Sequence, residues 1–148
     1  MEDKIRKAER ADFKKLESFL VEANVASSNL EDYIDYYSLL ETKSGTLKAC
    51  IGIEPVGNVG LLRSFVVSPG TTQVQVMMLF DRVVRIAEGN QLDAVYLVTN
   101  KQSAVTFFSK MGFQVEDQPE ASLVSHPHFQ QLSTVDNAFV MQMPVEKK

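Results

Sequence analysis

The sequence predicts an α/β fold built on a mixed, mostly antiparallel sheet of six or seven strands with about four helices. Strand and helix periods alternate along the chain. Three strands follow one another between residues 37 and 67, and strand–helix–strand units come after them. A length of 148 residues, with 45% apolar and 23% charged residues, suits one globular domain over residues 1–148.

The N-terminal half predicts a strand, two helices and a three-strand meander. The first helix follows from apolar residues that recur on one side, from Phe13 to Ala23. The expected elements are a strand at 4–8, a helix at 11–24, a second helix opened by a capping box at 28–31, strands at 37–42 and 46–54 around a hairpin turn at 43–45, and a turn at 55–60 before a strand at 61–67.

The C-terminal half predicts two strand–helix units and a closing strand. A helix from Thr72 ends at Gly89-Asn90, because glycine and asparagine readily terminate helices. The remaining expectations are a strand at 93–98, a short helix capped by Thr99 or Asn100, a strand at 112–115, a polar segment at 117–137 with a turn of helix near Phe129, and a last strand at 138–145.

Composition narrows the function classes. A net charge of −4 argues against nucleic-acid binding through a broad basic face. No secretory signal and no apolar run of membrane-spanning length is visible, so we expect no membrane partner and a cytoplasmic location. The single cysteine, Cys50, cannot form an internal disulfide, and its apolar neighbours favour a small buried strand residue.

The most informative stretch runs from Leu61 to Phe80 and reads as a strand, a tight loop and the start of a helix. The first backbone N–H groups of a helix have no intrahelical partner, so this geometry often binds anions. The stretch therefore raises the question of whether this helix start holds a phosphate-bearing cofactor.

The order of elements, Val67-Ser-Pro69 before the central helix, and the segment from Asn100 to Phe113 resemble the GCN5-related N-acetyltransferase (GNAT) superfamily. Within it, residues 52–55, 60–64 and 129–138 resemble a small subgroup often found beside arsenic-resistance genes. The resemblance implies acetyl transfer from acetyl-CoA to a primary amine of a small, amino acid-like acceptor. It also implies a sheet splayed between the Leu61 and Asp93 strands, with the cofactor in the opening.

The resemblance assigns part of a cofactor site. Phe65, Val66 and Val67 match the strand whose backbone pairs with the pantetheine arm, and a bulge near Ser64 would aim those groups outward. The family's glycine-rich pyrophosphate loop corresponds here to a stretch that includes Gln73, Val74 and Gln75. That stretch has neither glycine nor a cation.

The altered loop has an energetic consequence. Thr72 and Gln75 can form a capping box that uses amides a pyrophosphate would need. Losing two or three phosphate contacts and a cation would cost on the order of 3–6 kcal/mol, or roughly two to four decades in affinity. Lys101 or Lys110, on the following helix, is the candidate to compensate.

The resemblance also suggests catalytic groups. The family's proton-donating tyrosine corresponds to Phe108, which cannot donate a proton, so Ser109 or Ser103 is the substitute. The alternative for Phe107-Phe108 is core packing. Glu54, at the end of the third strand, is the candidate general base, and a solvated strand end is its alternative.

Arg63 interrupts an apolar strand, so it either binds an acceptor carboxylate in a cavity or forms an ion pair on the outer face. Two roles are open for Tyr33 and Tyr37. They either line the acceptor pocket or pack in the core. His126 and His128 lack a thiol or carboxylate cluster, so no metal is expected.

Two function hypotheses stay open at this point. One is a working acetyltransferase with a small-molecule amine substrate. The other is a GNAT-like binding or regulatory module that has lost tight acetyl-CoA binding. The sequence also leaves open whether the chain forms a homodimer.

Overall fold

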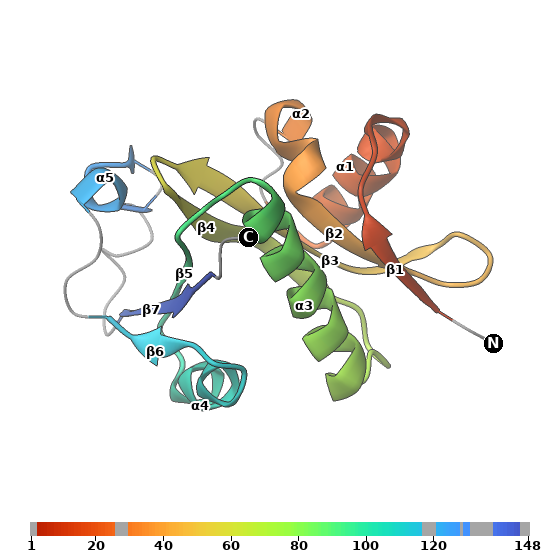
Figure 1. The fold of residues 1–148 in the computed structure, drawn as a ribbon. Helices are drawn as coiled ribbons and strands as arrows, with labels where there is room; N and C mark the ends of the chain where they lie inside the picture. The colour runs from red at the N-terminus through yellow and green to blue at the C-terminus, as the bar shows by residue number, and fades with distance from the viewer. Residues whose placement is uncertain (1–2, 26–29, 117–120, 128, 131–137, 146–148) are drawn as a thin grey trace. The chain divides into compact units, whose positions relative to one another are not determined.

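The computed structural model describes residues 3–25, 30–116, 121–127, 129–130 and 138–145 (Figure 1). Its strands are β1 (Lys4–Lys7), β2 (Tyr37–Glu41), β3 (Leu47–Val56), β4 (Val59–Val67), β5 (Ala94–Thr99), β6 (Gln114–Val115) and β7 (Phe139–Pro144). Its helices are η1 (Arg10–Asp12), α1 (Phe13–Glu22), α2 (Leu30–Tyr33), η2 (Ile34–Tyr36), α3 (Gln73–Gly89), α4 (Gln102–Lys110) and α5 (Ala121–Val124).

The strands form one seven-stranded sheet in the order β1-β2-β3-β4-β5-β7-β6. The pairs β1/β2, β2/β3, β5/β7 and β6/β7 are antiparallel, whereas β4 and β5 are parallel. The register of the parallel pair sets Val59–Leu61 opposite Ala94–Tyr96. A mixed, mostly antiparallel sheet of six or seven strands is therefore confirmed.

The chain divides into two compact units. The first comprises Met1–Glu54 and Arg63–Ile86, and the second comprises Pro55–Leu62 and Ala87–Lys148. Each unit has its own cluster of buried apolar side chains.

In the first unit, helices cover both faces of the strands. Residues of α1 and α2 pack with Tyr37, Leu39 and Cys50 in one apolar cluster. Figure 1 shows α3 crossing the other face of these strands. The stripe Val76, Leu79, Phe80 and Val83 of α3 is buried, as its helical spacing requires.

In the second unit, the β3–β4 hairpin tip packs with β5 and the region around α5. The cluster contains Val56, Val59, Leu61, Ala94, Tyr96, Leu123 and Phe129. On α4, Phe108 is buried and contacts Phe107 and Phe113 edge to face, with ring centroids 5.3 Å and 5.7 Å away. Core packing of Phe107-Phe108 is therefore confirmed.

Two local predictions are wrong. The expected turn at 55–60 is only the pair Gly57-Asn58, because Gly57, at φ 59°, reverses the chain and leaves the residues on either side free to pair. The N-cap of α4 is Lys101 rather than Thr99 or Asn100, since Thr99 still belongs to β5. Part of the capping box expected at 28–31 lies outside the described residues.

Candidate functional site

A buried ion pair joins β3 to β4. Arg63 Nη1 donates to Glu54 Oε1 at 3.0 Å, and the two side chains are 7% and 8% exposed. The alternative of a solvated strand end for Glu54 is wrong, because the strand continues past Glu54 and its side chain is buried. The alternative for Arg63 is correct in that Arg63 forms an ion pair, but the pair is buried rather than on the outer face. Removing two charges from water is costly, so such a pair is a candidate functional feature rather than a source of stability.

Tyr33, at the end of α2, lies against this pair. The Arg63 guanidinium carbon lies 5.6 Å from the centre of the Tyr33 ring, within cation–π distance. Burial, and next the nearby charge of Glu54, raise the pKa of the Tyr33 phenol. Tyr33, Arg63 and Glu54 therefore form one contiguous group in the first unit.

Tyr37 extends the group across the sheet. Its side chain is fully buried, and its hydroxyl donates to Ser64 Oγ at 2.8 Å. Burial is the main cause that raises the pKa of Tyr37, and the hydrogen bond to Ser64 opposes it. The ring lies over Gly52, its cross-strand partner, where a Cβ atom would stand 2.6 Å from a ring carbon.

Ser64 forms an irregularity within β4. It has φ 56°, the left-handed region that residues with a Cβ rarely adopt. On one side of it, Arg63 contacts Glu54 and Tyr33. On the other, Val66 packs against the α1/α2 cluster, and Phe65 contacts Phe80 of α3 edge to face at 5.2 Å. Arg63 and Val66 would point to opposite faces of a regular strand, so the expected bulge near Ser64 is confirmed.

The expected capping box at the start of α3 is also confirmed. The Gln75 backbone N–H donates to Thr72 Oγ1 at 3.1 Å, and the Thr72 N–H donates to Gln75 Oε1 at 3.0 Å. Two amides of this helix start are therefore already occupied. Of the other cofactor candidates on this helix, Gln73 and Val74 are exposed.

A cation that the sequence analysis did not consider lies at the same helix start. Lys48 Nζ donates to Asp3 Oδ2 at 2.9 Å and to Gln75 Oε1 at 3.4 Å, and Gln75 Nε2 donates to Asp3 Oδ2 at 2.8 Å. The hydrogen bond from Lys48 is the main cause that lowers the pKa of Asp3. A basic residue thus lies at the start of α3, paired with an acidic residue.

Lys48 reaches this position because β3 has a bulge. Leu40 pairs with Ala49 and Glu41 pairs with Leu47, so Lys48 has no cross-strand partner on β2. A shifted hydrophobic alternation was the available signal, since Leu47 and Cys50 belong to one apolar cluster although they are three residues apart.

The remaining predicted residues belong to the second unit. Lys101 is exposed at the N-cap of α4, and its carbonyl accepts from the Ala104 and Val105 N–H groups. Ser109 is exposed near the end of that helix. Their assigned roles stay predictions of the family resemblance.

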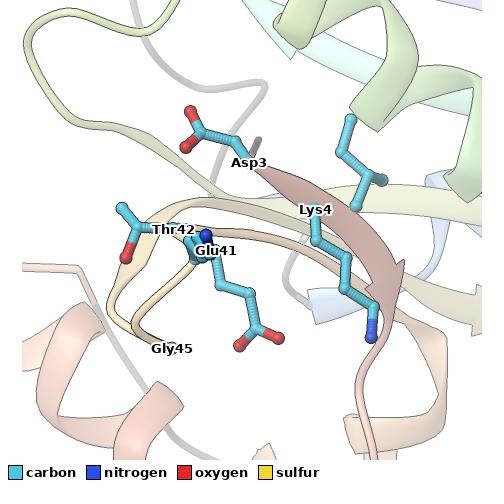
Figure 2. A pocket seen from close by; sticks show the side chains of 7 residues that line it. Asp3, Lys4, Glu41, Thr42 and Gly45 are labelled. Atoms are coloured by element: carbon cyan, nitrogen blue, oxygen red, sulfur yellow. The ribbon is translucent and has the colours of Figure 1, made fainter. Parts of the chain in front are cut away.

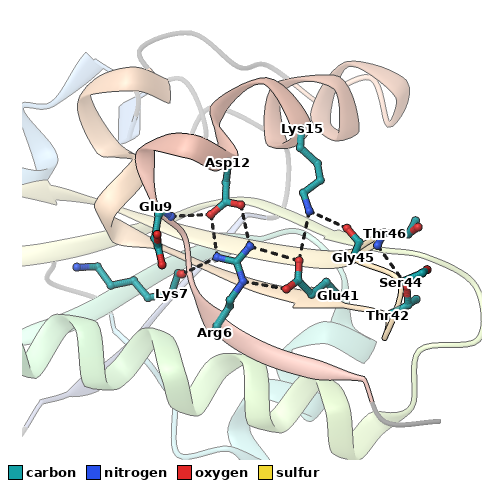
Figure 3. A network of polar contacts seen from close by, with 10 residues as sticks. All are labelled: Arg6, Lys7, Glu9, Asp12, Lys15, Glu41, Thr42, Ser44, Gly45 and Thr46. Carbon is teal, nitrogen blue, oxygen red and sulfur yellow. Dashed lines mark hydrogen bonds and ion pairs between the residues drawn. The ribbon is translucent and has the colours of Figure 1, made fainter.

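A hollow in the first unit lies at the opposite end of β2 from Tyr37 (Figure 2). Its lining residues are Asp3, Lys4, Ile5, Glu41, Thr42, Lys43 and Gly45. Glu41 in this wall already pairs with Arg6 and Lys15, as Figure 3 shows. None of the sequence-predicted site residues lines it, so we assign it no role in the site.

Within the described residues, no three His, Cys, Asp or Glu side chains group as metal ligands do, and His128 lies outside the described ranges. In the same part of the chain, no helix combines the length and apolar composition needed to cross a membrane.

In fold, the chain is similar to solved acetyltransferases. It superposes on N-acetylglutamate synthase from Neisseria gonorrhoeae, solved with coenzyme A and N-acetyl-glutamate, with a TM-score of 0.73 and 18% identity, over 99% of this chain and 36% of that one. It also matches a GNAT-family acetyltransferase from Staphylococcus aureus, with a TM-score of 0.71 and 19% identity, over 98% and 100% of the two chains. The Mycobacterium tuberculosis protein Rv2747, solved with CoA, has a TM-score of 0.74 and 14% identity, over 97% and 99%. The chain therefore has a GNAT fold.

No protein-family model matches the chain. It is, however, 30% identical over 139 residues to the uncharacterized protein YwlB of Bacillus subtilis (strain 168), covering 93% of this chain and 95% of YwlB. At that identity and coverage, the chain belongs to the family of YwlB.

Proposed function

We propose that this protein is an N-acetyltransferase that transfers an acetyl group from acetyl-CoA to the primary amine of a small, amino acid-like acceptor. The observation that carries the proposal is the buried Glu54–Arg63 pair with Tyr33 beside it, next to the β4 segment Phe65–Val67. GNAT-fold relatives solved with CoA, and one also with N-acetyl-glutamate, support this class of reaction. A place in the arsenic-linked subgroup is part of the same proposal.

The residues fit two parts of the reaction. Glu54 is the proposed base: its carboxylate takes a proton from the acceptor ammonium, and the freed amine attacks the thioester carbonyl as the C–N bond forms and the C–S bond breaks. Arg63 is the proposed partner of an acceptor carboxylate, because a guanidinium offers donors in a fork that matches it. Ser109 is proposed to protonate the departing thiolate, and the second proton lost from the acylated nitrogen replaces the one that Ser109 gives up.

The residues fit the cofactor unevenly. Backbone pairing along Phe65–Val67 needs no particular side chain, and Phe65 and Val67 are 39% and 38% exposed, so this segment suits a pantetheine arm. The start of α3 suits a pyrophosphate poorly, because Thr72 and Gln75 cap each other and Lys48 is paired with Asp3. Acetyl-CoA, when bound, supplies the activated acetyl group.

The capping box favours a second candidate function, a binding or regulatory module without acetyl-CoA chemistry. Calorimetric titration with acetyl-CoA and with free CoA separates the two candidates. Saturable binding, together with acetylation of amino acids followed by mass spectrometry, supports the enzyme. An absence of binding up to millimolar cofactor supports the module.

Two variants test the roles of the pair. Glu54→Gln keeps a hydrogen-bonding group toward Arg63 and should lower kcat at least about tenfold, as expected for loss of a general base. Arg63→Lys should raise KM for amino acids more than KM for acetyl-CoA, and it should change little for amines without a carboxylate. Lys101→Ala tests whether Lys101 binds the phosphates of the cofactor. It should raise the KM for acetyl-CoA and leave the KM for the amino acid unchanged.

A further inference from the structure

The bulge at Ser64 has an unusual support. A serine at φ 56° is disfavoured by its Cβ, so surrounding contacts must hold it there. Two side chains from β2 and β3 do so: the Tyr37 hydroxyl of β2 donates to Ser64 Oγ at 2.8 Å, and the Cys50 thiol of β3 donates to the Ser64 carbonyl at 3.2 Å.

Tyr37 reaches Ser64 only because of Gly52. β3 lies between β2 and β4 in the sheet, so the Tyr37 side chain must cross it to reach β4. The register places Tyr37 opposite Gly52, and a Cβ there would come within 2.7 Å of three ring carbons. Three residues on three strands therefore act together: Ser64 forms the bulge, Tyr37 donates the hydrogen bond to it, and Gly52 leaves the space that the Tyr37 ring occupies.

The bulge sets the direction of the residues on both sides of it, the proposed acceptor-binding Arg63 and the proposed cofactor-binding segment Phe65–Val67. Before it, Arg63 points to Glu54 and Tyr33. After it, the alternation is shifted, so Phe65 contacts Phe80 and the Phe65–Val67 backbone continues in the shifted register. The hydrogen bond from Tyr37 to Ser64 thus lies at the junction between the proposed acceptor group and the proposed cofactor strand.

We propose that Tyr37 is a positioning residue whose hydroxyl fixes the Ser64 bulge and thereby orients the Phe65–Val67 backbone toward the cofactor. This inference rests on the proposed function for the identity of that cofactor. It replaces the sequence-based role of Tyr37 as a pocket-lining residue, because the side chain is fully buried and its hydroxyl is directed to Ser64.

The test is Tyr37→Phe, which removes the hydroxyl and keeps the ring. In the protein without cofactor, amide hydrogen exchange of residues 65–67 should accelerate at least about tenfold, while exchange in β1 stays unchanged. CoA affinity measured by calorimetry should fall at least about tenfold. Tyr36→Phe, which removes the hydroxyl of the adjacent residue on η2, should change neither.

A rescue variant separates positioning from general destabilisation. Glycine adopts a left-handed φ without support, so Tyr37→Phe combined with Ser64→Gly should bind CoA more tightly than Tyr37→Phe alone. A merely structural role for the hydroxyl predicts the reverse, because a second substitution would add a further loss.

Each outcome decides a different claim. If the natural protein does not bind CoA, the proposed function fails, and hydrogen exchange still tests the hydroxyl's hold on the bulge. Unchanged exchange at residues 65–67 in Tyr37→Phe overturns the inference. Equal CoA affinity of the natural protein and Tyr37→Phe also overturns it, while leaving the proposed function in place.

Discussion

At the scale of single residues, two small residues of β3 make room for contacts with the neighbouring strands. Gly52 has no side chain, and the Tyr37 ring occupies the space above it. Cys50, two residues earlier, is fully buried and hydrogen-bonded to the Ser64 carbonyl, which confirms the sequence interpretation of a small buried strand residue. Both positions serve the geometry of β4 rather than reacting themselves.

Substituting Gly52 should cost stability. Gly52→Ala forces a Cβ against the Tyr37 ring, and overpacking of this kind typically costs about 1–3 kcal/mol. Urea unfolding followed by circular dichroism measures the loss in the free energy of unfolding. Gly89→Ala is the control, because nothing lies within 4 Å of its added Cβ and the change should be neutral or slightly stabilising. Equal stability of Gly52→Ala and the natural protein would contradict the packing described for Tyr37.

The Cys50 thiol should be unreactive in the folded protein. Burial raises its pKa to about 12, so little thiolate exists at pH 8 and reagents have no access to it. Alkylation with iodoacetamide should be at least about a hundredfold slower in native buffer than in 8 M urea. Comparable rates in the two conditions would show that the thiol is accessible.

At the scale of elements, the start of α3 is stabilised by contacts from within the chain. The capping box completes the helix internally, and Asp3 places a carboxylate beside Lys48 and Gln75. An N-cap stabilises a helix by roughly 1 kcal/mol, whereas each hydrogen bond to a charged group is worth roughly 1.5–3 kcal/mol. The capping box therefore stabilises the helix start by less than the same two amides could gain from a bound phosphate.

Acetyl-CoA should consequently bind weakly, with a Kd at or above roughly 100 μM. A variant carrying Thr71→Arg, Thr72→Gly and Val74→Gly restores a cation and bare amides, and it should raise affinity at least about tenfold. Its melting temperature should fall, because the cap is lost and glycine weakens a helix. Val76 stays unchanged because it is buried. Low-micromolar binding by the natural protein would contradict this view of the loop.

At the scale of the whole molecule, the chain consists of two compact units with separate apolar clusters. The first unit has a charged network that joins β1, η1, β2 and α1 (Figure 3). Arg6 binds Asp12 at 2.7 Å and Glu41 at 2.9 Å, and Lys15 binds Glu41 at 3.3 Å. Hydrogen bonds from Arg6 are the main cause that lowers the pKa of both Asp12 and Glu41.

These lowered pKa values predict acid sensitivity. A carboxyl group whose pKa is lower in the folded than in the unfolded protein stabilises the fold above its ordinary pKa. That stabilisation is lost as pH falls through the lower, folded value. The free energy of unfolding should therefore decrease below about pH 4, and Asp12→Asn should flatten that decrease while lowering stability at pH 7.

Arg85→Ala is the control for the acid experiment, since its pair with Asp81 joins side chains that are 67% and 66% exposed. Urea titrations at a series of pH values should give the same acid profile for this variant as for the natural protein. An unchanged profile in Asp12→Asn would mean that other groups govern acid unfolding.

The sequence by itself determined the order of helices and strands, the buried stripe of α3, the Thr72–Gln75 capping box and the burial of Cys50 and Phe108. Most of these follow from local spacing or residue chemistry, which a sequence displays directly. The bulge near Ser64 was an expectation of the family resemblance. Only the tertiary structure decided three features. Lys48 has no cross-strand partner on β2, the Tyr37 ring lies over Gly52, and Glu54 and Arg63 form a buried ion pair. These contacts join residues on different strands, and their register depends on a single extra residue in a bulge, which periodicity alone does not locate.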